Sequence, residues 1–209
     1  MDGKLYVKAE VAVVKRDEIK LLNGRGGGGV SRKESDLSEL VDGILTSRVY
    51  SDFKLVSNGV EFNVHKNFIA GQSETLHNAV ERWSADGKMF LDEYKSEVVQ
   101  NMIKYFYRKP LEEEVFNNNV VEFQNIGEKY DLPKLKSKAE LSMITNLSKE
   151  TYIEYLIAGY LFKAAKLKEA ALKFIAQNKN LWNRNSAEMM KKFEGKQELL
   201  IEIINAFTT

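Results

Sequence analysis

The sequence predicts an α+β fold, in which a small sheet is covered by helices and followed by an all-helical extension. Three observations predict it. Residues 53–64 hold two short runs of alternating apolar residues around an Asn-Gly pair, which is typical of a β-hairpin. Residues 96–109 space their apolar residues at helical intervals, and so does most of the chain from residue 117 onward. The chain has 209 residues, enough to bury a substantial core.

Composition excludes several classes of function. Apolar residues make up 44% and charged residues 29%, and the net charge is +1, so nothing directs the chain to nucleic acid or anionic lipid. There is no cysteine, which excludes disulfides, thiolate metal sites and cysteine nucleophiles. The opening MDGKLYVKAE is not a signal peptide, and no apolar run is long enough to cross a bilayer. We expect a soluble protein of the cytoplasm and/or nucleus, with no nucleic-acid or membrane partner.

Residues 1–22 contain one predicted strand. Alternate positions of KLYVKAEVAVV are apolar and fall on one face of a strand: Leu5, Val7, Ala9, Val11 and Val13. A single strand is not stable in water. It must therefore pair with a distant sheet edge or with another molecule, or be the remnant of a lost domain.

The segment NGRGGGGV follows at residues 23–30. A phosphate-binding loop would place its glycines directly before a helix, with Lys-Ser/Thr at the helix start or with a GxGxxG spacing. We find no GK[ST] sequence and expect no helix immediately after the glycines. Four consecutive glycines are also poorly preorganised for an anion. A flexible linker over residues 23–34 is the favoured interpretation, and a nucleotide enzyme is the alternative.

The following elements alternate between helix and strand. Asp36 and Glu39 form a capping-box pattern that starts a helix over residues 36–45. The hairpin comes next, followed by a helical stretch that reaches Trp83 and is split near Gly71. A short strand is expected in MFLDEY. The helix after it is capped by Ser96 and stops before Pro110. That last helix carries one apolar stripe, namely Val98, Val99, Met102, Ile103 and Phe106.

The rest of the chain is helical in pattern. The expected helices cover residues 120–130, 132–144, 149–162, 166–177 and 196–207. We expect the stripe of the fourth to lie inside the helical extension; it comprises Ala164, Leu167, Ala171, Phe174 and Ile175. The acidic LEEEV at residues 111–115 is interpreted as a solvated turn or edge strand rather than a metal site.

No catalytic, cofactor-binding or metal-ligating constellation emerges. The two histidines, His65 and His77, have neither HExxH spacing nor an acid–base partner nearby in sequence. His65 stands at the end of a predicted strand, where a structural hydrogen bond explains it. We therefore expect a protein that is not an enzyme and that holds no cofactor.

Several motifs in this order resemble the BTB/POZ domain. They are Asp52 before the hairpin, the His65–Lys66 pair, Ser73, and Tyr107 in SEVVQNMIKYFYRKP. The segment GEKYDLPKLKSKAELSMITNLSKET continues the resemblance, with matches at Tyr130, Leu132, Leu135 and Lys136. The resemblance implies the BTB/POZ fold over residues 35–146 and a BACK-like helical extension over residues 147–209. Within this family the chain looks most similar to MATH-BTB proteins of the speckle-type POZ protein kind, with residues 1–22 as a terminal MATH-like strand.

The resemblance implies a homodimer, or a dimer with a related BTB protein. The helix over residues 36–45 is too short to be stable alone, so its apolar face needs a partner. The implied interface comprises Leu37, Leu40, Val41, Ile44, Leu45, Ile69 and Leu76. The alternative is that these side chains pack on their own domain.

MATH-BTB proteins are substrate adaptors of cullin-RING ubiquitin ligases, so the resemblance also implies binding to a cullin N-terminal domain. By position, the cullin-facing residues are Trp83, Tyr105, Tyr107, Asn118 and Tyr130. The loop in VERWSADGKMF departs from the family, because it is short and lacks the apolar–x–Glu triplet of cullin-binding relatives. The alternative function is a BTB dimerisation or scaffold protein that does not bind cullin. The substrate stays unknown.

Overall fold

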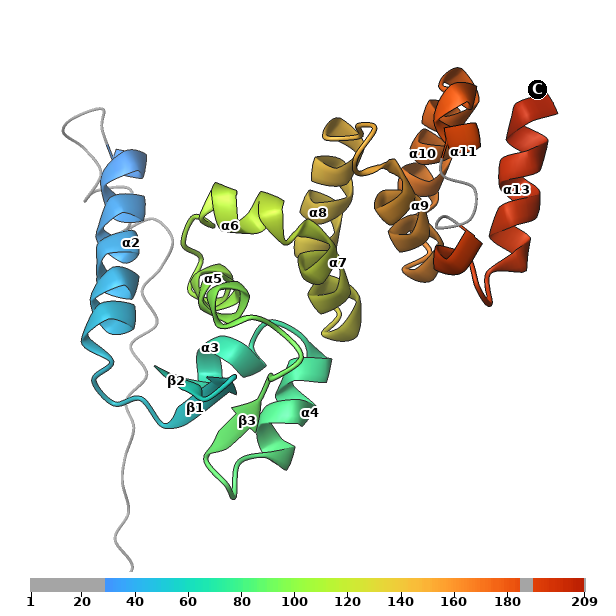
Figure 1. Ribbon diagram of the computed structural model, residues 1–209. Helices are drawn as coiled ribbons and strands as arrows, with labels where there is room; N and C mark the ends of the chain where they lie inside the picture. Colours follow the sequence, from blue (N-terminus) through green and yellow to red (C-terminus); the bar gives the residue numbers. More distant parts are fainter. Residues whose placement is uncertain (1–28, 185–189, 209) are drawn as a thin grey trace, which may run out of the picture. The chain divides into compact units, whose positions relative to one another are not determined.

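A computed structural model describes residues 29–184 and 190–208 (Figure 1). The chain divides into two compact units, residues 1–43 and residues 44–209. The predicted strand within residues 1–22 and the glycines up to Gly28 lie outside the described residues.

Helix α2 covers Gly29–Ser47 and starts seven residues before Asp36, where the capping box predicted its beginning. Its first residue is the last of the four consecutive glycines, so the expectation that no helix follows them directly was wrong. Residues assigned to the linker, Gly29 to Glu34, are helical. The segment Arg32–Lys33–Glu34 consists of good helix formers, which extend the helix past a local capping signal.

The sheet has three strands in the order β2-β1-β3 among the described residues. Strands β1 (Phe53–Ser57) and β2 (Val60–Val64) are antiparallel, with Leu55 opposite Phe62. Asn58 and Gly59 have φ of 49° and 81°, the left-handed pair that a tight hairpin turn requires, and the predicted hairpin is confirmed. Strand β3 (Lys88–Phe90) pairs with β1 in parallel and is shorter than MFLDEY suggested.

Helices α3 (Lys66–Ala70) and α4 (Glu74–Arg82) lie between β2 and β3 in sequence, and α5 (Ser96–Phe106) follows β3. The break near Gly71 is confirmed, and the whole predicted stripe of α5 is buried. Ser96 is not the cap of α5, because Lys95 holds that position. The Ser96 hydroxyl instead donates to the carbonyl of Ser57, at 3.0 Å, and joins α5 to the end of β1.

Helices α6 (Glu113–Asn118), α7 (Val120–Lys129) and α8 (Pro133–Thr145) follow. The interpretation of residues 111–115 as a turn or edge strand was wrong, because α6 begins inside them. Its first turn holds Glu113 and Glu114, and carboxylates there favour a helix by facing the positive end of its dipole. Pro133 occupies the first turn of α8, where its missing N–H costs nothing.

The extension consists of α9 (Tyr152–Leu161), α10 (Ala165–Gln177), α11 (Lys179–Arg184) and α13 (Gln197–Thr208). In Figure 1, α10 lies beside both α9 and α13, with which it makes its main contacts. The buried core of these helices comprises Tyr152, Leu156, Ala171, Ile175, Phe193, Leu199 and Ile203. Of the predicted stripe of α10, only Phe174 is half-buried rather than buried. An α+β fold with a helical extension is therefore confirmed.

Candidate protein-interaction surfaces

His65 and Tyr107 form a closed hydrogen-bond circuit at the end of β2. The backbone N–H of His65 donates to the Tyr107 hydroxyl at 3.0 Å, and that hydroxyl lies 2.6 Å from His65 Nδ1. The hydroxyl therefore donates to Nδ1, which leaves Nε2 to carry the imidazole proton and donate to the Val49 carbonyl at 2.9 Å. Tyr107 is fully buried and stacks on Phe68, with ring centroids 4.3 Å apart. The predicted structural role of His65 is confirmed.

Ser73 links two elements that are far apart in sequence. Its hydroxyl oxygen accepts from the backbone N–H of Leu76 at 3.2 Å and so caps α4. The same hydroxyl donates to the carbonyl of Tyr130, at 2.6 Å, directly after α7. This bond fixes the beginning of α4 against the end of α7, and the two helices then line one side of a surface groove.

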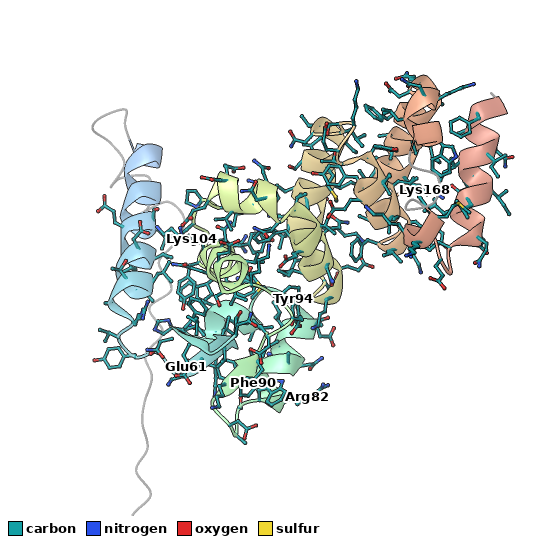
Figure 2. The ribbon with its side chains drawn as sticks, viewed as in Figure 1. Glu61, Arg82, Phe90, Tyr94, Lys104 and Lys168 are labelled. Atoms are coloured by element: carbon teal, nitrogen blue, oxygen red, sulfur yellow. The ribbon has the colours of Figure 1, made fainter. Side chains whose placement is uncertain are left out.

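That groove, which we call the Trp83–Phe90 groove, lies among α4, β3 and the end of α7. Its volume is about 520 Å³, and its lining includes Ala79, Arg82, Trp83, Phe90, Lys129 and Tyr130. The rings of Trp83 and Phe90 meet edge to face, with centroids 6.1 Å apart. Phe90 is 43% exposed, and Figure 2 shows it close to Arg82.

Cationic side chains surround the aromatic lining of the Trp83–Phe90 groove. The ammonium group of Lys88 lies 5.3 Å from the Phe90 ring centroid, and that of Lys129 lies 5.2 Å from the Tyr130 ring centroid. Lys129 also pairs with Glu93. Burial raises the pKa of the Tyr130 phenol, and the Glu93 carboxylate adds to the rise, so Tyr130 stays neutral. Because Glu93, which also lines the groove, pairs with Lys129, the cations that remain beside the aromatic rings are Arg82 and Lys88, and with them the groove suits an apolar side chain accompanied by an acidic group.

The loop between α4 and β3 is a compact turn. The N–H of Gly87 donates to the carbonyl of Trp83, at 3.1 Å, and Gly87 has φ of 67°. Only residues 83–87 separate the two elements. The loop at this position therefore contains no apolar–x–Glu triplet, and it is too short to present an equivalent segment.

The residues assigned to cullin contact do not all lie together. Trp83 and Tyr130 share the groove. Tyr105 is half-buried on α5, and Asn118 is exposed at the end of α6, beside a small polar pocket that also holds Lys95 and Glu122. Tyr107 is buried behind His65, so its side chain has no surface to offer from this position. The sequence analysis did not identify Phe90 as a surface residue. The signal was present, because Phe90 stands between Met89 and Leu91 in a short predicted strand, and alternate residues of a strand point to opposite faces.

The residues assigned to the dimer interface separate into two groups. On α2, Leu37 is 62% and Leu40 is 60% exposed, while Val41, Ile44 and Leu45 are half-buried. Ile69 and Leu76 are buried in the core of residues 44–209 and are not available to a second chain in this conformation. They were assigned because helical periodicity identifies an apolar face without telling which partner covers it.

The helical extension carries two further pockets. One of about 290 Å³ is mainly apolar, with Val121 of α7 and Ile157, Leu161 and Phe162 of the α9 region in its lining. The other, of about 600 Å³, lies between α9, α10 and α13 and contains the Lys168–Glu202 ion pair, whose Lys168 is labelled in Figure 2. The carboxylate of Glu198 in the same pocket accepts from the hydroxyl of Tyr160 at 3.4 Å.

In residues 29–184 and 190–208, His, Asp and Glu side chains do not gather in groups of three or more that could hold a metal ion. The described helices also include none that is both long and apolar enough to span a membrane.

Comparison with known proteins gives one family match. The BTB/POZ domain model matches residues 42–147, just over half of the chain. The chain is 24% identical over 180 residues to Protein maternal effect lethal 26 of Caenorhabditis elegans, with 84% of this chain and 45% of that protein covered. It thus spans less than half the length of that relative. Among solved structures, the chain is similar to the BTB domain of human gigaxonin, with 19% identity and a TM-score of 0.39, covering 64% of this chain and 97% of that chain.

Proposed function

Because the chain belongs to the BTB/POZ family, whose domains mediate protein–protein interactions, we propose that it is a homodimeric substrate adaptor of a cullin-RING ubiquitin ligase. The observation that carries the proposal is the Trp83–Phe90 groove, which combines an exposed aromatic anchor with a cationic rim. Aromatic residues in such grooves supply much of the binding energy of protein interfaces. The cullin N-terminal domain is the partner that the resemblance to MATH-BTB proteins implies.

The dimer is supported by the exposed leucines of α2. Leu37 and Leu40 lie one turn apart, and exposed apolar side chains on one helix face favour association with another chain. Dimers of this kind are commonly two-fold symmetric, so the same helix serves both subunits. Light scattering is expected to give twice the 23.9 kDa mass of one chain. A monomer mass at about 100 µM protein would contradict the dimer, because permanent dimers are far tighter than that.

Calorimetric titration with a cullin N-terminal domain tests the adaptor function. We expect Phe90→Ser to weaken binding by about tenfold or more, because it removes the exposed anchor. Val60→Ser is the matched control, since Val60 is also exposed but lies on β2, outside the groove lining. A wild-type protein that fails to bind at tens of micromolar would end the adaptor proposal.

A second function is a BTB dimerisation or scaffold protein without cullin binding. The compact turn at residues 83–87 favours it, because the turn leaves no room for the missing apolar–x–Glu segment. The same titration separates the two functions, since the scaffold dimerises and leaves the cullin unbound. In either function we propose that the chain performs no catalysis and acts in the cytoplasm and/or nucleus. Microscopy of a fluorescent fusion tests the location.

A further inference from the structure

Residues 48–51, between α2 and β1, form a strained loop with two exposed apolar side chains. Arg48 and Tyr50 have φ of 54° and 60°, in the left-handed region that residues other than glycine rarely adopt. Between them, Val49 is 53% exposed, and Tyr50 is 93% exposed. The N–H of Arg48 donates to the Ile44 carbonyl at 3.2 Å, so the left-handed Arg48 is an ordinary end of α2. Tyr50 is left-handed beyond the helix, and its side chain stands in solvent.

The strain is maintained by specific contacts. His65 Nε2 donates to the carbonyl of Val49 at 2.9 Å, and the Tyr107 circuit fixes the tautomer that makes this possible. The N–H of Ser51 donates to the carbonyl of Arg48 at 3.2 Å, which closes the loop. On the far side, Asp52 is held through its N–H to the carbonyl of Val64 and through its carboxylate, which accepts from the N–H of Lys66. Non-glycine residues stay in the left-handed region when their surroundings over-determine them, and such positions concentrate at functional sites.

We infer that His65 holds this loop so that Val49 and Tyr50 are presented to a second copy of the chain. The inference rests on the proposed homodimer and adds a contact to it. The second copy is favoured over other partners because the loop continues directly in sequence from α2, whose exposed Leu37 and Leu40 already favour that partner. A tyrosine can bury roughly 150–250 Å². That is a sizeable share of the ~800 Å² per subunit in a standard interface.

Sedimentation equilibrium of the full chain tests the contact. We expect Tyr50→Ser to raise the dimer dissociation constant by about tenfold or more. Val60→Ser, which also replaces an exposed apolar side chain but on β2, is the matched control and is expected to leave the constant unchanged. Because Tyr50 is almost fully exposed, its replacement does not remove core packing, and circular dichroism is expected to be unaltered.

Two substitutions at His65 test its positioning role. The amide of Asn reaches the place of Nδ1, so His65→Asn keeps the contact to Tyr107 and loses the one to Val49. The longer Gln places its amide near Nε2, so His65→Gln keeps the donor to Val49. We expect His65→Asn to weaken the dimer and His65→Gln to restore it. Equal weakening by both variants would overturn the assignment of His65, since a merely structural histidine would not distinguish them.

The outcomes separate this inference from the proposed function. A wild-type dimer that Tyr50→Ser leaves unchanged refutes the loop contact and retains the homodimer. If Tyr50→Ser dimerises normally but no longer binds the cullin N-terminal domain, the loop contact is also refuted, because the loop then serves another partner. A wild-type chain that is monomeric at about 100 µM refutes the homodimer and the loop contact together.

Discussion

Gly127 on α7 approaches Lys136 on α8 so closely that an added Cβ would lie 3.0 Å from the Lys136 backbone. The same relationship recurs 32 residues later, where a Cβ on Gly159 would lie 2.8 Å from the backbone nitrogen of Lys168. The turns between these residues, GEKYDLPKLK and GYLFKAAKLK, also agree in detail. Asp131 and Lys163 have φ of 50° and 53°, and each following N–H, of Leu132 and of Ala164, donates to the glycine carbonyl, at 2.8 and 2.9 Å. The hairpins α7–α8 and α9–α10 are therefore built on one repeated turn.

Replacing either glycine by alanine is expected to destabilise the protein. The new methyl group meets backbone atoms, which cannot move aside as a flexible side chain can, and overpacking of this kind costs about 1–3 kcal/mol. Gly159→Ala is expected to cost more than Gly127→Ala, because its contact is the shorter one. Urea unfolding followed by circular dichroism measures the difference.

The matched control for these variants is Gly43→Ala. Gly43 also lies inside a helix, but an added Cβ there meets no atom within 4 Å. Alanine is the better helix former by about 0.5–1 kcal/mol, so this variant is expected to be neutral or slightly stabilising. A loss of stability equal to that of Gly159→Ala would show that close approach is not the cause.

Tyr107→Phe is expected to lower the free energy of unfolding by about 1–3 kcal/mol. The substitution removes the hydroxyl that accepts from the His65 backbone and donates to its imidazole, and it leaves these half-buried polar groups of His65 without that partner. Tyr160→Phe is the comparison, since the Tyr160 hydroxyl makes a long 3.4 Å bond at an exposed position. Similar losses in both variants would argue against the importance of the circuit.

Stability is expected to fall at alkaline pH. Burial raises the pKa of the phenols of Tyr94 and Tyr130 above the ordinary value of 10. Between the unfolded and folded pKa values, the unfolded state has lost the protons that the folded state still holds, so rising pH favours unfolding. The contribution of these tyrosines is fully present below pH 10 and is lost above it.

The alkaline effect can be measured by urea unfolding between pH 9 and pH 11.5, at up to about 1.4 kcal/mol per pH unit for each tyrosine. Tyr94→Phe combined with Tyr130→Phe is expected to flatten the dependence. An unchanged slope in the double variant would assign the effect to other groups.

Gln124→Leu is expected to stabilise the protein. Gln124 on α7 is completely buried, and neither its amide nitrogen nor its amide oxygen has a hydrogen-bond partner in the structure. Such an unsatisfied group costs about 1–3 kcal/mol, which a leucine of similar size avoids. Thermal unfolding measures the change, and Gln124→Asn, which keeps the amide, is the control. A lower melting temperature for the leucine variant would reveal a partner for the amide.

The local pattern of the sequence predicted most of the elements because their causes are local. The Asn58–Gly59 turn can be read from two residues, and the stripe from Val98 to Phe106 from one helix period. The start of α2 was misplaced because a capping signal at Asp36 is weaker than the helix propensity of the residues before it. The turn repeated at Gly127 and Gly159 was visible in sequence as G-x-x-aromatic followed by KLK, but it needed the chain to be compared with itself.

The candidate surfaces were less predictable, because they depend on which neighbour covers a side chain. Ile69 and Leu76 share the apolar character of Leu37, yet the first two fill the core and the last is exposed. Tyr107 and Trp83 are both aromatic residues directly after a helix, and only Trp83 lines a groove. The exposure of Tyr50 follows from two left-handed residues, for which the segment SRVYSD has no glycine as a signal.

The bond from Ser73 to Tyr130 joins residues that are 57 positions apart, whereas each repeated turn closes over nine. Contacts that are close in sequence form fast, and distant ones form slowly. During synthesis on the ribosome, α4 cannot be secured until Tyr130 has left the exit tunnel. At ordinary translation rates of about 5–20 residues per second, the nascent sheet region waits several seconds with apolar surface uncovered, and this interval is when a chaperone would have most to protect.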